Sequence, residues 1–210
     1  MKIELKNVSK LLNKKKVLDH INISFESGKV YGIRGYNGSG KTMMLRVISG
    51  LMYPTEGEAS IDGKILGKDM DFPPSVGILI EAPAFIGNIS GDKNLEMILS
   101  LRSDSVKDGF VHDMMKKVGL EDGIGLKYNR YSLGMKQRLG IAAAIMEEPE
   151  LLILDEPTNA LDEDGIALVG ALIKELRDAN RVILVASHER DFLEKVSDVV
   201  YQMKEGKILV

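Results

Sequence analysis

The most informative part of this sequence is a glycine-rich segment, Gly35-Tyr36-Asn37-Gly38-Ser39-Gly40-Lys41-Thr42. A glycine followed after four residues by Gly-Lys-Thr is the phosphate-binding loop pattern, in which glycines let the backbone wrap a phosphate without Cβ clashes. We therefore expect this segment to bind the phosphates of a nucleoside triphosphate. Lys41 is expected to reach the β- and γ-phosphates, and the Thr42 hydroxyl to hold Mg²⁺.

The residues on either side of this segment support the same interpretation. Upstream, 29–33 reads as a short buried strand, and downstream, 42–48 has the apolar spacing of a helix. A strand, loop and helix in this order direct backbone N–H groups and the positive end of a helix dipole at an anion. The sequence therefore predicts the nucleotide-binding core of an α/β protein.

A second motif is an apolar strand that ends in two acids, Leu151-Leu152-Ile153-Leu154-Asp155-Glu156. In a parallel sheet, ligands bind at the carboxyl ends of the strands. We expect Asp155 to hold Mg²⁺, through water, beside Thr42, and Glu156 to orient and deprotonate the attacking water. Taken alone, the pair is equally compatible with a solvated acidic turn, but the phosphate-binding loop favours the catalytic interpretation.

The rest of the chain alternates between strand and helix patterns. Residues 1–30 resemble an antiparallel hairpin with a turn at Asn13–Lys16, and 76–80 is a short buried strand. From Glu81 to about Tyr131 the pattern becomes helical, broken by glycines, which predicts an inserted helical lobe. The remaining expected elements are helices 92–102, 105–118, 134–147, 162–179 and 189–195 and strands 151–155, 182–186, 199–203 and 207–210.

We therefore predict an α/β fold, a P-loop NTPase core with a mostly parallel sheet, an N-terminal antiparallel β subdomain and an inserted helical lobe. A single domain is expected over 1–210. Its core would comprise 1–81 and 132–210, and its helical lobe about 82–131.

Composition limits the possible partners. The chain has 210 residues, a formal net charge of −3 and no cysteine, which excludes a disulfide scaffold and a thiolate metal site. The acidic balance argues against nucleic acid, and the single basic run, Lys14–Lys16, is expected to be a solvated hairpin tip. No apolar run approaches the ~20 residues that span a bilayer, so any membrane-spanning part is expected on another polypeptide.

Further residues give the whole chain a resemblance to the ATP-binding subunits of ABC transporters. Tyr131-Ser132-Leu133-Gly134-Met135 lies at the position of the family's LSGGQ signature and is followed by Lys136-Gln137-Arg138. The D-loop matches Asn159-Ala160-Leu161-Asp162, the switch histidine matches His188, and the Q-loop position is occupied by Glu81. His20 and His112 match no such position and are interpreted as structural.

The resemblance implies a mechanism and a set of partners. The signature of one copy would face the phosphate-binding loop of a second copy, or of a paralogous ATPase, in a head-to-tail dimer that encloses ATP and Mg²⁺. Ser132 is a plausible N-cap for the following helix, whose N-terminus would face a γ-phosphate. His188 would donate a hydrogen bond to that phosphate. The chain would act at the cytoplasmic face of the cell membrane, bound to a transmembrane permease.

Three departures from the family pattern are informative. Glu81 replaces a glutamine and adds a negative charge as a third expected Mg²⁺ ligand, and we hypothesise that it couples ATP chemistry to the permease. Leu133 and Met135 replace a glycine and a glutamine of the signature. Neither Leu11 nor Leu12 supplies the usual adenine-stacking aromatic, so base stacking would be weaker or come from elsewhere.

The combination of Glu81 with Ser-Leu-Gly-Met-Lys-Gln is similar to the bacitracin-resistance and lantibiotic-immunity branch. This likeness implies export of peptide antibiotics or related amphiphiles. Many members of that branch carry a C-terminal extension, which we do not expect after Val210.

Two other functions remain open at this stage. A non-transport ABC ATPase could act on ribosomes or DNA, although the single ATPase core, the absence of heptad coiled coils and the acidic balance disfavour it. A nucleotide-binding regulator without turnover is the other alternative. The intact set of Lys41, Thr42, Asp155, Glu156 and His188 argues against a regulator.

Overall fold

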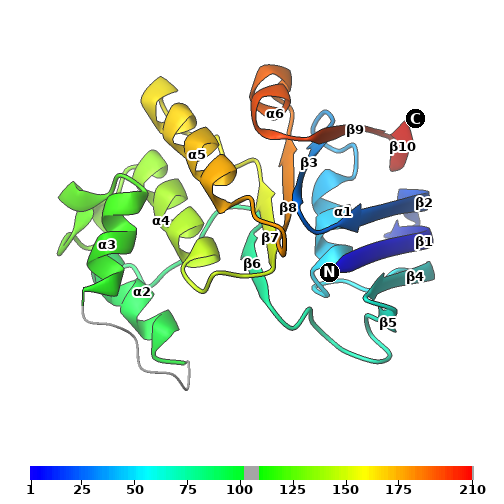
Figure 1. Cartoon of the computed structure of the whole chain (residues 1–210), viewed down its shortest axis with the longest axis horizontal. Helices are drawn as coiled ribbons and strands as arrows, with labels where there is room; N and C mark the ends of the chain where they lie inside the picture. The colour runs from blue at the N-terminus through cyan, green and yellow to red at the C-terminus, as the bar shows by residue number, and fades with distance from the viewer. Residues whose placement is uncertain (102–108, 210) are drawn as a thin grey trace.

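Two β-sheets lie on either side of helix α1 (Lys41–Ile48) in the computed structural model (Figure 1). The structure describes residues 1–101 and 109–209. Both sheets contribute buried side chains to the same hydrophobic cluster around this helix, including Phe25, Leu45 and Ile153. The helix that follows the phosphate-binding loop is thus fixed by packing on both sides.

The larger sheet carries the functional strand ends. Its six strands follow the order β10-β9-β3-β8-β7-β6, in which all neighbours are parallel except β10 and β9. Because the parallel strands share one direction, the ends of β3, β6, β7 and β8 lie along one edge of the sheet. These strands are β3 (Lys29–Arg34), β6 (Val76–Leu79), β7 (Leu151–Asp155), β8 (Val182–Ser187), β9 (Val199–Lys204) and β10 (Lys207–Leu209).

The smaller sheet is antiparallel and has the order β2-β1-β4-β5. Its strands are β1 (Lys2–Leu12), β2 (Lys15–Glu26), β4 (Glu56–Ile61) and β5 (Lys64–Ile65). The turn between β1 and β2 is shorter than predicted, because Asn13 and Lys14 alone adopt the left-handed conformation of a two-residue hairpin turn. Lys15 and Lys16 therefore belong to β2 rather than to the hairpin tip.

Buried strands of the parallel sheet divide their side chains between two hydrophobic clusters. Leu151 and Ile153 of β7 face the cluster around α1, whereas Leu152 and Leu154 face the opposite cluster. This division follows from the period of two in a strand, and it explains why 151–154 is apolar at every position.

Helices cover the second face of the parallel sheet (Figure 1). The covering helices are α4 (Leu133–Ile145), α5 (Glu163–Leu176) and α6 (Arg190–Val196). Buried side chains of each of these helices belong to the hydrophobic cluster that includes Leu152. Within the described residues, no helix is long and apolar enough to cross a membrane.

Among its described residues, the predicted helical lobe contains two helices and two short 3₁₀ turns at the far side of α4 (Figure 1). They are α2 (Gly91–Leu99), α3 (Phe110–Lys117), η1 (Glu121–Gly123) and η2 (Tyr128–Arg130). Both helices are shorter than predicted, and the predicted positions 102 and 105–108 lie outside the described residues. Leu95, Met115 and Tyr131 share one cluster with α4 and the sheet, so the boundary of the lobe stays a prediction.

The order of elements confirms the predicted mixture of a mostly parallel sheet, an antiparallel N-terminal sheet and covering helices. At the described positions, the predicted strands and helices lie within a few residues of the observed ones, but strands β4 and β5 were not predicted. The sequence did not predict the order of strands in the parallel sheet.

We predict that Gly77→Ala destabilises the fold by about 1–3 kcal/mol, because overpacked sites cost that much. A Cβ at Gly77 would overlap the backbone carbonyl oxygen of Ala144, where β6 contacts α4, and a backbone atom cannot rotate away. Gly87→Ala is the matched control, since a Cβ there would meet only ordinary van der Waals contact. Urea unfolding measures both variants, and equal stabilities would contradict the close approach.

Candidate functional site

The phosphate-binding loop connects β3 to α1 and is folded around the side chain of Lys41. The Lys41 ammonium group donates hydrogen bonds to the carbonyl oxygens of Gly35 at 2.6 Å and Tyr36 at 3.4 Å. Gly40 has φ +107°, a conformation that L side chains rarely adopt, and a Cβ at Gly35 would overlap the Ser39 hydroxyl. The glycines of the motif are thus required by the backbone path of the loop.

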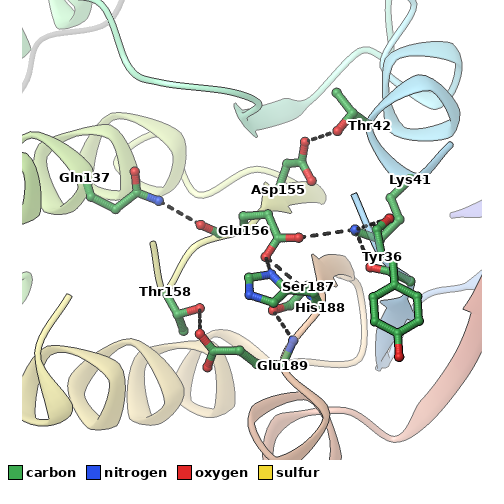
Figure 2. A network of polar contacts seen from close by, with 11 residues as sticks. Tyr36, Lys41, Thr42, Gln137, Asp155, Glu156, Thr158, Ser187, His188 and Glu189 are labelled. Carbon is green, nitrogen blue, oxygen red and sulfur yellow. Dashed lines mark hydrogen bonds and ion pairs between the residues drawn. The ribbon is translucent and has the colours of Figure 1, made fainter. Parts of the chain in front are cut away.

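Thr42 and Asp155 join the loop to the end of β7. The Thr42 hydroxyl donates a hydrogen bond of 2.6 Å to one carboxylate oxygen of Asp155 (Figure 2). The other oxygen of Asp155 is buried and has no hydrogen-bond partner among residues 1–101 and 109–209. Burial raises the pKa of the Asp155 carboxyl, and the hydrogen bond from Thr42 opposes this shift.

These two residues fit a magnesium ion that is bound together with nucleotide. Within the described part of the chain, no group of three His, Asp or Glu side chains could hold a metal by itself. Mg²⁺ usually keeps several waters and uses one or two carboxylates with substrate phosphates, so such a group is not needed. The unpartnered oxygen of Asp155 beside the Thr42 hydroxyl provides a suitable pair of oxygen donors.

Glu156 lies between Lys41 and His188. One carboxylate oxygen is 3.2 Å from the Lys41 ammonium nitrogen, and the other is 2.9 Å from Nδ1 of His188 (Figure 2). The backbone N–H of Glu156 donates to the carbonyl oxygen of Ala186 at 2.8 Å, which ties this residue to β8. The predicted base, the phosphate-binding lysine and the predicted switch histidine are therefore brought together in one network.

The structure adds residues to this network that the sequence did not identify as functional. The side-chain amide of Gln137 donates to the carbonyl oxygen of Glu156 at 3.0 Å, and the Thr158 hydroxyl donates to Glu189 at 3.3 Å (Figure 2). Gln137 is buried, which is unusual for a glutamine in a helix. That mismatch between residue type and burial appears only in the folded chain.

The signature segment and the D-loop contact each other. The Ser132 hydroxyl accepts a hydrogen bond of 3.1 Å from the backbone N–H of Met135, which confirms the predicted N-cap of α4. A Cβ at Gly134 would approach the carbonyl oxygen of Ala160, so the two segments pack closely. Asp162 caps α5 by accepting from Gly165 at 2.9 Å and also pairs with Arg138 at 3.2 Å. Leu133 is 72% exposed.

The phosphate-binding loop and the signature line separate cavities. A cavity of about 550 Å³ is lined by the whole loop except Gly35 and by Leu12, Lys15, Lys16, Glu81 and Glu156. A second cavity of about 580 Å³ is lined by the signature, Arg138 and the segment 160–162. Lys41, Thr42 and Glu156 therefore line the first cavity and the signature lines the second, while Leu133, Asp155 and Glu156 share a third cavity of about 280 Å³.

Glu81 lies at the carboxyl end of β6 and differs from the other predicted metal ligands. Its carboxylate is 2.6 Å from a guanidinium nitrogen of Arg46 in α1, and its side chain is 61% exposed. It lines the phosphate-loop cavity and also a neighbouring one with Pro83, Leu133 and Gln137. Arg46 is a residue that the sequence had not singled out.

The part of the first cavity beyond the loop is lined by aliphatic and charged side chains. Leu12 lines it, as do Lys15 and Lys16, which the sequence assigned only to a solvated turn. Tyr36 is the single aromatic residue among its lining residues, and its side chain is 84% exposed. Weaker stacking on the nucleobase stays a prediction. His20 and His112 are both exposed and lie outside this cavity.

Comparison with known proteins agrees with this geometry. The sequence model of the protein family described as ABC transporter matches residues 18–159 of this chain. An uncharacterised ABC transporter ATP-binding protein, YybJ of Bacillus subtilis (strain 168), is 43% identical over 206 residues, covering 98% of this chain and 94% of the relative. The bacitracin transport ATP-binding protein BcrA of Enterococcus faecalis is 40% identical over 209 residues, covering 99% and 68%.

Two further proteins complete the comparison. The lantibiotic transport ATP-binding protein SrtF of Streptococcus pyogenes is 32% identical over 209 residues, covering 99% of this chain and 89% of the relative. The ATP-binding cassette MJ0796, solved as a dimer in a post-hydrolysis state bound to ADP and Pi, superposes with a TM-score of 0.88. It is 25% identical, with 99% of this chain and 97% of that chain covered.

We predict that Asp155→Asn makes the nucleotide-free protein more stable at neutral pH. The folded-state pKa of Asp155 lies above the unfolded value of 3.8, so the folded state retains the proton to higher pH than the unfolded state does. The contribution of Asp155 to the free energy of unfolding therefore falls as pH rises from below 3.8 through the folded-state pKa. The difference in unfolding free energy between variant and wild type should grow over that window and then stay constant.

Urea unfolding at a series of pH values measures this difference, and Glu147→Gln at an exposed carboxyl is the control. If the difference in unfolding free energy between Asp155→Asn and wild type does not depend on pH, the raised pKa of Asp155 is contradicted. The same substitution should reduce the rise in melting temperature that MgATP produces, because a ligand stabilises only as far as it binds the folded state.

Proposed function

This chain belongs to the ABC transporter family, and we propose that it powers the export of a peptide antibiotic or a related amphiphile through a separate membrane permease. It is the ATP-binding subunit and an ABC ATPase. The observation that carries the ATPase part of the proposal is the meeting of two pairs at one edge of the sheet, Thr42 with Asp155 and Lys41 with Glu156. The names of the bacitracin and lantibiotic relatives support the class of exported molecule.

In the proposed reaction, the phosphate chain of ATP would compete with Glu156 for the Lys41 ammonium group. Lys41 is 5% exposed and pairs with Glu156, so an incoming phosphate would take over this cation. Glu156 would then be free to accept a proton from the attacking water, while His188 donates to the γ-phosphate. Bound Mg²⁺, held by Thr42 and Asp155, would supply charge stabilisation at the phosphates.

A second copy, or a paralogous ATPase, is proposed to complete the site. The cavity lined by Ser132, Gly134 and Met135 is separate from the one lined by the phosphate-binding loop, which supports a signature that acts on the nucleotide of a partner. The N-terminus of α4, a helix of 13 residues, could present N–H groups to the partner's γ-phosphate. A head-to-tail dimer would close around ATP and exclude bulk water.

The proposed location is the cytoplasmic face of the cell membrane, through the permease. No described residue set and no relative named above supports action on ribosomes or DNA, and the net charge of −3 disfavours the latter. Purification of the tagged chain from native membranes, followed by mass spectrometry, tests this assignment. A polytopic membrane protein in the eluate is expected, and ribosomes or DNA-bound proteins instead would refute it.

We predict that Glu156→Gln binds ATP but loses turnover by about 10²–10⁴-fold, the usual contribution of a general base. The amide can still accept a hydrogen bond but cannot take a proton. Phosphate release measures turnover, and size-exclusion chromatography with MgATP should show a trapped dimer. Normal hydrolysis by this variant would exclude Glu156 as the base.

We predict that Glu81→Gln binds nucleotide but uncouples or retunes transport. The change removes one negative charge while keeping the size of the side chain, which lines both the phosphate-loop cavity and the cavity toward Leu133. Resistance of cells that express the variant together with its permease to bacitracin measures coupling, with the ATPase rate as the reference. If cells with Glu81→Gln are as resistant as cells with the wild type, Glu81 does not couple ATP hydrolysis to transport.

A further inference from the structure

Arg46 and Glu81 form an ion pair next to the expected metal position. The nitrogen and oxygen atoms are 2.6 Å apart, and the pair joins the α1 helix to the residue that follows β6 by two positions. Arg46 lies four residues after Thr42, and residues four apart lie on one face of a helix. The face of α1 that carries the Thr42 hydroxyl therefore also carries the guanidinium group that binds Glu81.

Three carboxylates surround this region, and each one has a different partner. Asp155 accepts from Thr42, Glu156 contacts Lys41 and His188, and Glu81 contacts Arg46. The charges of Glu156 and Glu81 both contribute to the raised pKa of Asp155, so the three groups lie within electrostatic reach. Arg46 is thus the cation that compensates the additional negative charge of Glu81.

The geometry of Glu81 leaves its side chain able to exchange partners. Its backbone is in the left-handed conformation with φ 63°, its side chain is 61% exposed, and it borders the phosphate-loop cavity. Exposed ion pairs contribute little to stability because water and salt screen them. Breaking the contact with Arg46 therefore costs little free energy.

We propose that Arg46 is a positioning residue that holds the Glu81 carboxylate beside α1 and competes with Mg²⁺ for it when MgATP binds. This inference rests on the proposed role of Glu81 as a metal ligand. The Arg46–Glu81 contact then sets the Mg²⁺ concentration at which nucleotide binds. Arg46 contacts the Glu81 carboxylate and is not among the described residues that line the phosphate-loop cavity.

The test is a double-mutant cycle with Arg46→Met and Glu81→Gln, read as Mg²⁺ affinity rather than as turnover. A fluorescent, non-hydrolysable ATP analogue is held at fixed concentration while free Mg²⁺ is titrated. Arg46→Met should lower the half-saturating Mg²⁺ concentration about two- to fivefold, as expected for loss of a competing surface ion pair. Glu81→Gln should raise it, and adding Arg46→Met to Glu81→Gln should change nothing further.

An equal shift from Arg46→Met in both backgrounds, or an increase in half-saturating Mg²⁺, would overturn the inference. Lys117→Met is the matched control, because it removes the cation of an exposed ion pair between Lys117 at the end of α3 and Glu175 in α5. Arg46→Gln gives the same comparison if the methionine variant fails to fold. Absence of Mg²⁺-dependent analogue binding in the wild type would instead refute the proposed function itself.

Discussion

Parallel pairing of β3, β8, β7 and β6 is the constraint on which the site depends. Their register sets Arg34 opposite Ser187 and Asp155 opposite Ala186, so segments far apart in sequence end at one edge of the sheet. The phosphate-binding loop, Glu156 and His188 follow from these ends. The hydrogen bond from Thr42 to Asp155 then attaches α1 to the same edge. Without the common strand direction these side chains would lie at opposite ends of the sheet.

Charge compensation is the second principle of the site. Buried charges are costly unless they are paired, and Lys41 and Glu156 are both largely buried. Lys41 pairs with one oxygen of Glu156, and His188 contacts the other. The charge of each buried group is therefore compensated by a neighbour at the same edge of the sheet.

The separation of the two cavities has a structural origin in α4. Its N-terminus carries Ser132 and Leu133 at one cavity, and one turn later Gln137 contacts the carbonyl oxygen of Glu156. The helix thus connects the catalytic strand end to the surface where a partner is proposed to bind. Its buried apolar side chains lie in the cluster shared with α2, α3 and the sheet.

The sequence by itself determined the loop, the helix after it, the acidic strand end, the N-cap at Ser132 and the alternation of strands and helices. These features depend on residue type and on periods of 2 or 3.6, which act within a few residues. Only the tertiary structure decided the strand order, the contact of Lys41 with Glu156, the burial of Gln137 and the pairing of Arg46 with Glu81. These features depend on packing between segments that are far apart in the sequence. The periodicity of residues within one helix or strand does not specify which other segment it packs against.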